Sequence, residues 1–189
     1  MSHSNQSIRP HDRGFFVSET DTLWADLASR VIRVALERKG VSYAVLADTL
    51  TSIGVKETER SLISRVSRGT VKLTLLLQII DVTRALPPRL WIDAVRIRGT
   101  WEDRARAVVA AELAQQPWVT PQKLLRLLAD IGADINEKAL VSQLSSGAIP
   151  LSLFLQCIVV LGTSSLDRYI DFPDLVSAVR PTIDDDMAE

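Results

Sequence analysis

Basic and hydroxyl side chains recur at helical spacing between residues 60 and 72. Positions 61, 64, 65 and 68 are spaced three, one and three residues apart, so in a helix they lie along one side. Arginine can bond guanine O6 and N7 bidentately, and serine can bond base edges or phosphates. The pattern therefore predicts a helix that reads the major groove of DNA. The residues expected to contact DNA in this segment are Arg60, Ser61, Ser64, Arg65, Arg68 and Lys72.

Two further hydroxyl groups lie upstream, at Ser42 and Tyr43. If a helix begins there, its unpaired N–H groups and these hydroxyls can hold a DNA phosphate. Glu57 and Glu59 act in the opposite direction. Their carboxylates favour the dipole of a helix that starts at this point, but they repel a nearby phosphate. The alternative interpretation of the same residues is an ordinary solvated helix face.

Residue types used in catalysis are scarce in the part of the chain expected to fold. Both histidines, His3 and His11, lie near the N-terminus, so the rest of the chain has no His-based metal site or general base. The acidic run at residues 184–186 is typical of a solvated tail. Cys157 is interpreted as a core thiol and not a reactive one. No glycine-rich phosphate loop is found, and we expect a non-enzymatic protein without a cofactor or metal.

The formal net charge of the 189 residues is −1, with 47% hydrophobic and 24% charged residues. This composition is that of a globular protein, but the charge is unevenly distributed. Residues 24–100 carry 13 Lys/Arg and 7 Asp/Glu, whereas residues 101–170 carry 6 and 7. The first part is therefore basic and the second is near neutral. Neither a secretory signal nor an apolar run of membrane-spanning length is found, which predicts a cytoplasmic protein with no membrane contact.

The chain contains the same unit twice. Residues 41–78 align with residues 119–156 without a gap, and 14 of the 38 positions are identical. This internal repeat indicates a tandem duplication. We expect copy 1 at residues 21–96 and copy 2 at residues 97–172. A disordered tail, residues 1–20, would precede them, and an acidic tail, residues 173–189, would follow.

The two copies differ in charge at the segment expected to read DNA. Arg65 and Arg68 of copy 1 are matched by Gln143 and Ser146 of copy 2. Without these cations, copy 2 would gain little from the release of DNA counterions. We therefore expect DNA contact from copy 1, and dimerisation or contact with another protein from copy 2.

Each copy is expected to form four or five short helices, which makes the fold class all-α. An apolar stripe at helical spacing runs from Trp24 to Ala35, and the apolar run 73–82 is expected at the buried centre of copy 1. Leu62, Ile63 and Val66 are expected to pack inward. The expected N-cap residues are Ser42, Thr58, Thr120 and Asn136, and the expected helix stops are Gly54, Gly69, Gly132 and Gly147. A last short helix is expected in "RLWIDAV" and in "LDRYIDF".

The layout of copy 1 resembles that of lambda-repressor-like helix-turn-helix proteins. A short helix in residues 42–50 begins with Ser and contains Leu-Ala, Gly54 follows, and residues 58–69 supply the recognition helix. The chain resembles still more an uncharacterised bacterial family of small helical domains. That resemblance rests on Gly40-Val41-Ser42-Tyr43, Leu46-Ala47, Leu50, Gly54, Glu57-Thr58, Leu62, Arg68-Gly69 and Gln78.

The family resemblance covers residues 24–93 well and residues 101–171 more loosely, because copy 2 has Pro121, Leu125 and Ser146 where the pattern has Tyr, Ala and Arg. It implies two tandem helix-turn-helix-like bundles. The expected function is that of a DNA-binding bacterial transcriptional regulator, with residues 58–68 in the major groove of double-stranded DNA and a homo-oligomer reading paired half-sites. A protein-interaction module without DNA contact is the alternative.

Overall fold

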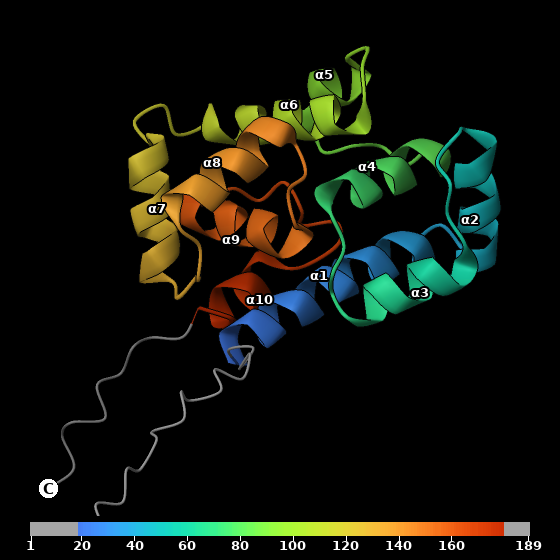
Figure 1. Ribbon diagram of the computed structural model, residues 1–189, viewed down its shortest axis with the longest axis horizontal. Helices are drawn as coiled ribbons and strands as arrows, with labels where there is room; N and C mark the ends of the chain where they lie inside the picture. Colours follow the sequence, from blue (N-terminus) through green and yellow to red (C-terminus); the bar gives the residue numbers. More distant parts are fainter. Residues whose placement is uncertain (1–18, 180–189) are drawn as a thin grey trace, which may run out of the picture.

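The computed structural model describes residues 19–179, and these residues fold into helices without a β-strand (Figure 1). Copy 1 comprises α1 (Glu19–Glu37), α2 (Tyr43–Ser52), α3 (Glu59–Ser67), α4 (Leu73–Val82), the 3₁₀ turn η1 (Arg89–Trp91) and α5 (Ile92–Arg96). Copy 2 comprises α6 (Trp101–Leu113), α7 (Pro121–Asp130), α8 (Glu137–Ser146), α9 (Leu151–Leu161) and α10 (Phe172–Ser177). The predicted all-α fold of two tandem helical units is confirmed.

The local signals that begin and end the helices act as expected in both copies. The N-cap side chains of Ser42 and Thr58 accept hydrogen bonds from the third residue of their helices, and Thr120 and Asn136 do the same in copy 2. Each such bond satisfies an N–H that has no partner within the helix. Gly54 and Gly132 follow α2 and α7 at φ of 87° and 80°, a left-handed conformation that glycine adopts without strain.

The two copies form one body because the first helix of each copy packs against the other copy. Besides its neighbours in copy 1, α1 packs against α9 of copy 2, and α6 of copy 2 packs against α4 of copy 1. The central helices α4 and α9 are buried around nearly their whole circumference, as their continuous apolar sequences require. The cores of the two copies are therefore continuous.

An approximate two-fold axis relates the copies. Lys72 and Pro150, which occupy the same position in the repeat, form an isolated antiparallel bridge. Its two hydrogen bonds run from Leu73 N to Ile149 O (2.9 Å) and from Leu151 N to Val71 O (2.8 Å). Reciprocal bonds between equivalent residues are the mark of two-fold symmetry. Figure 1 shows the same relation among the helices, with α2 and α7 at opposite sides and α6 and α1 at opposite edges.

The last short helix differs between the copies. In copy 1, "RLWIDAV" forms η1 and α5 as expected, and Trp91 donates from Nε1 to Oε1 of the buried Glu112 of copy 2 (2.5 Å). In copy 2, most of "LDRYIDF" forms turns, so the expected helix there is wrong, and α10 begins only at Phe172. A proline at the start of a helix is favourable, and Pro173 lies there.

Parts of the two expected tails belong to helices. Residues 19 and 20 already belong to α1, and most of residues 173–179 belong to α10, where Asp174 pairs with Arg30 of α1 (2.7 Å). The rest of the expected N-terminal and acidic tails, residues 1–18 and 180–189, lies outside the described residues, together with His3, His11 and residues 184–186.

Candidate nucleic-acid interface

The helix expected to read DNA, α3, is fixed tightly to α1. Leu62 and Val66 are buried beneath it, and the Ser29 hydroxyl of α1 donates to the carbonyl of Val66. Gly69, at φ 65°, lets the chain turn immediately against α1: a Cβ there would lie 2.2 Å from the carbonyl oxygen of Ala25. The position and direction of α3 are therefore set by contacts that do not involve its outer side.

The outer side of α3 differs from the predicted one. Arg60, Ile63 and Ser67 are exposed, whereas Ser61, Ser64 and Arg65 are only partly exposed. The prediction that Ile63 packs inward is wrong, since 42% of it is exposed. With 3.6 residues per turn, Leu62 and Val66 already fill the narrow line facing the core, so Ile63 is turned about 100° away from Leu62 into solvent.

Arg65 is engaged within the protein. Its guanidinium pairs with Glu57, which precedes the N-cap of α3, and the side chains of Arg65 and Glu57 are 32% and 14% exposed. Its Nε is buried and has no hydrogen-bond partner in the part of the chain that the structure describes. The carboxylate neutralises the guanidinium and holds it over the turn between α2 and α3. Of the predicted contact residues, Arg65 is therefore the one whose charge is already bound.

Three other predicted cations lie free at this end of the molecule. Arg60, Arg68 and Lys72 are exposed, and no hydrogen bond or ion pair within residues 19–179 involves their charged groups. Arg60 lies in the first turn of α3, Arg68 at its C-cap, and Lys72 at the bridge to copy 2. A phosphate that approached them would meet no competing carboxylate bonded to these groups.

The two hydroxyls upstream lie at the N-terminus of α2. Ser42 is exposed and its oxygen accepts from Val45 N (3.3 Å), which leaves the hydroxyl proton available to another acceptor. Tyr43 is half-buried. Burial raises the pKa of its hydroxyl, and the nearby Arg33 opposes that shift, so the hydroxyl is protonated at neutral pH and can also donate.

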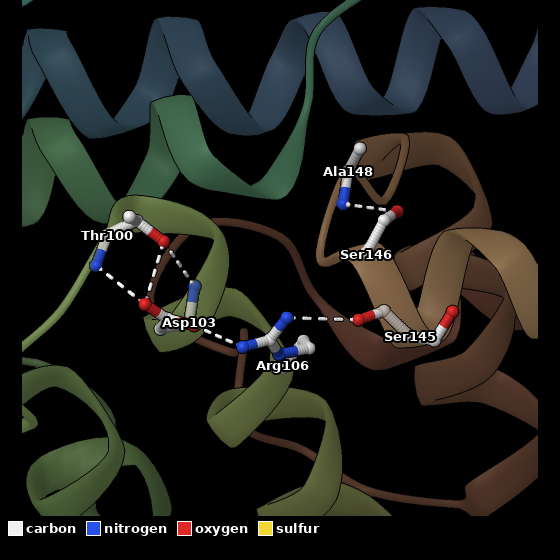
Figure 2. Close-up of polar contacts among 6 residues, drawn as sticks. All are labelled: Thr100, Asp103, Arg106, Ser145, Ser146 and Ala148. Carbon is white, nitrogen blue, oxygen red and sulfur yellow. Dashed lines mark hydrogen bonds and ion pairs between the residues drawn. The ribbon is translucent and has the colours of Figure 1, made fainter.

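In copy 2, α8 takes the place of α3 and is attached to α6 by a related device. The Arg106 guanidinium donates to the carbonyl of Ser145 (3.1 Å) and pairs with Asp103, which also accepts from the Thr100 backbone N–H (2.8 Å) and hydroxyl (2.9 Å). Figure 2 shows Arg106 between this capping box and the end of α8. Gly147 again lies where a Cβ would be 2.2 Å from a backbone oxygen, that of Glu102.

The outer side of α8 keeps the shape of α3 with less charge. Lys138 and Val141 stand where α3 has Arg60 and Ile63, and Val141 is 47% exposed. At the places of Arg68 and Lys72, copy 2 has Ser146 and Pro150. One free cation of α8 thus corresponds to three around α3.

The family described as Domain of unknown function (DUF6471) matches residues 24–86 and residues 101–166. The chain belongs to this family. Each DUF6471 segment runs from the tryptophan of its first helix past its fourth helix, so the family match repeats with the structural unit. No curated protein and no solved structure matches the chain.

Other candidate sites do not gather into a reactive centre within the part of the chain that the structure describes. Cys157 is buried on α9, and burial raises the pKa of its thiol to about 12, so it is protonated at neutral pH. No group of three or more His, Cys, Asp or Glu among residues 19–179 could hold a metal ion. No helix in this range has the length and apolar character to cross a membrane.

Proposed function

We propose that this DUF6471 chain is a non-enzymatic, double-stranded-DNA-binding protein of the helix-turn-helix type, acting in bacterial transcription regulation from the cytoplasm. The observation that carries the proposal is the placement of Arg60, Arg68 and Lys72 on or beside α3, exposed and without carboxylate partners among the described residues. An α-helix with such side chains fits the major groove.

The proposed roles follow from exposure. Arg60, in the first turn of α3, would meet base edges, and Ser61 and Ser64 beside it would bond bases or phosphates. Arg68 and Lys72 would bind phosphates on one flank, and Ser42 and Tyr43 at the N-terminus of α2 would bind them on the other. Arg65 would act indirectly, because its pairing with Glu57 removes a free carboxylate from the turn before α3.

A single α3 cannot give strong binding by charge alone. Two neutralised phosphates, at Arg68 and Lys72, give a slope of log K against log salt of about −2, which is small. We therefore propose that two chains read paired half-sites. Copy 2 supports α4 of copy 1 within each chain through α6, and its remaining outer surface would serve dimerisation or partner contact.

The test is binding of the purified protein to genomic DNA fragments over a salt series. Arg60→Ala with Arg68→Ala should weaken binding at least tenfold, because a base contact and a phosphate contact are lost, and the salt slope should move about 1 closer to zero. The melting temperature should hardly change, since both side chains are exposed. The matched control is Lys138→Ala with Ser146→Ala in copy 2. Unchanged binding by the copy 1 double variant would refute DNA contact through α3.

A protein-interaction module is the second candidate, and the exposure of Ile63 and Val141 at matching positions favours it. An aliphatic side chain at the centre of an exposed helix face suits a protein partner as well as a thymine methyl group. Under this alternative, Ile63→Ser and Val141→Ser would abolish capture of the protein partner, and the arginine variants would leave that capture intact.

A further inference from the structure

A cavity of about 550 Å³ lies between copy 2 and the first helix of copy 1, and the DNA proposal does not use it. It lies between the N-terminal part of α1, the segment before α8, and the facing sides of α8 and α9. Asp21 and Trp24 come from α1, Asp134 and Ile135 from the segment before α8, and Gln143 and Gln156 from α8 and α9. A cavity of this size accommodates a small organic molecule.

Two polar atoms on the cavity's lining residues have no partner within residues 19–179. Trp24 is 0% exposed, and in this range its Nε1 is buried without a hydrogen-bond acceptor, whereas the Oε1 of Gln143 is buried without a donor. Buried polar groups in native proteins are nearly always paired, because leaving one unpaired costs about 1–3 kcal/mol. A ligand that carries both a hydrogen-bond acceptor and a hydrogen-bond donor would satisfy the unpaired donor and the unpaired acceptor of this cavity.

The charge of the lining selects the kind of ligand. Asp21 and Asp134 line the cavity, whereas no Lys or Arg does so among the described residues. The amide groups of Gln143 and Gln156 add acceptor oxygens. A cation with several N–H donors is therefore favoured over an anion.

Copy 1 carries an internal counterpart of this cation. The residues that match Ile135 and Gln143 are Glu57 and Arg65, which pair with each other. In copy 1, the residues at these two positions therefore supply a guanidinium and a carboxylate that pair with each other. In copy 2 both have been replaced, the guanidinium by an amide and the carboxylate by an aliphatic side chain, and the cavity lies at those positions.

We propose that copy 2 binds a small organic cation, bearing a guanidinium or ammonium group, in the cavity between α1, α8 and α9. Gln143 Oε1 and the Asp134 carboxylate accept hydrogen bonds from the cationic group. Trp24 Nε1 donates to a neutral oxygen elsewhere on the ligand. The interaction depends on copy 2 and α1, and not on the cations around α3.

The test is calorimetric titration of the full chain with arginine amide, agmatine and putrescine. We expect saturable binding that favours guanidinium over ammonium, because a guanidinium donates in a planar fork. Arginine amide should bind more tightly than agmatine, because only its amide oxygen can accept from Trp24 Nε1. Butylurea, an uncharged analogue of the guanidinium end of agmatine, should not bind. Failure of all three cationic probes to bind would overturn the proposal, as would equal binding of butylurea.

Matched variants locate the binding. Gln143→Leu should weaken it about tenfold by removing the buried acceptor, and Asp134→Asn about fivefold, as for an exposed charge. Asp130→Asn, an exposed acid on α7 outside the cavity, is the control and should bind normally. The double change Ile135→Glu with Gln143→Arg installs the copy 1 pair and should abolish binding while the circular-dichroism spectrum stays unchanged. Undiminished affinity in Gln143→Leu would place the ligand elsewhere and refute the proposed site.

The result is independent of the DNA proposal. If the Arg60/Arg68 variant loses DNA and still binds the cation, each site stands on its own. If DNA binding fails in every variant and the cation still binds at Gln143, the cavity is supported and the DNA proposal alone is rejected.

Discussion

At the scale of single residues, glycines decide how closely the third helix of each copy approaches the first. Gly69 and Gly147 are left-handed and also lie against the backbone of α1 and α6, so two separate costs oppose any side chain there. Gly54 is left-handed as well, at φ 87°, but nothing lies within 4 Å of an added Cβ. The comparison separates the conformational cost from the cost of the close contact.

Gly69→Ala should therefore destabilise the protein more than Gly54→Ala. We expect about 1–2 kcal/mol for Gly54→Ala, the cost of a left-handed alanine. For Gly69→Ala we expect about 3 kcal/mol or more, because the backbone must also move to relieve an overpacked contact. Denaturant unfolding measures both. Equal losses in the two variants would contradict the assignment of Gly69 as a contact glycine.

At the candidate site, only some of the side-chain roles could be predicted from the sequence. The free cations Arg60, Arg68 and Lys72 could be proposed because their charge and spacing are local properties. The pairing of Arg65 with Glu57 could not, since the two lie eight positions apart across a helix start. A signal was nevertheless present in the repeat: both partners change together in copy 2, to Gln143 and Ile135.

At the scale of helices, the capping box of α6 ties a helix start to the packing of α8. Asp103 accepts from the Thr100 backbone and hydroxyl, and also pairs with Arg106, which reaches Ser145. The hydrogen bonds from Thr100, followed by the charge and hydrogen bond of Arg106, lower the pKa of Asp103. The ionised carboxylate is thus the form that the folded protein favours.

This arrangement gives a stability difference that depends on pH. A carboxylate with a lowered pKa stabilises the fold above its unfolded pKa of about 3.9, and the contribution is lost as the pH falls through the folded value. Asp103→Asn should therefore lower the melting temperature at pH 7, and the difference from wild type should shrink below about pH 4. Glu102→Gln, an exposed acid in the same turn, is the control for the helix dipole. A difference that persisted unchanged at pH 2.5 would contradict this role.

Helix boundaries were predictable because caps and stops are encoded within a few residues. Ser42, Thr58, Thr120 and Asn136 all cap the helices assigned to them. What lies against each helix was not predictable. An apolar stripe on α1 shows that one side is buried, but the packing of α1 on α9 of the other copy is set by contacts across more than a hundred residues.

At the scale of the whole molecule, the exchange of first helices makes one cooperative unit of the two copies. The buried faces of α4 and α9 each need a helix from the other copy. Neither copy could separate without exposing apolar surface, which costs about 25 cal/mol per Å². Units that share a core in this way unfold together.

We therefore expect a single unfolding transition for the full chain, with equal calorimetric and van't Hoff enthalpies. Gly69→Ala in copy 1 and Gly147→Ala in copy 2 should each lower the temperature of that one transition, by about 2–4 °C per kcal/mol for a protein of this size. Differential scanning calorimetry makes the measurement. Two resolved transitions, with each variant shifting only one of them, would disprove the shared core.

The bridge between Lys72 and Pro150 lies on the approximate two-fold axis, yet the two residues that form it differ. The two copies of this chain can therefore differ in sequence at equivalent positions. In a homodimer, both subunits have the same sequence, so every mutation changes both sides of the two-fold axis. Here Arg84 holds a left-handed backbone at φ 52°, whereas the corresponding position of copy 2 is Gly162 at φ 63°. Because the two copies are joined in one chain, a position in one copy can change while the equivalent position in the other stays the same. One copy can therefore acquire a new role while the other keeps the original one.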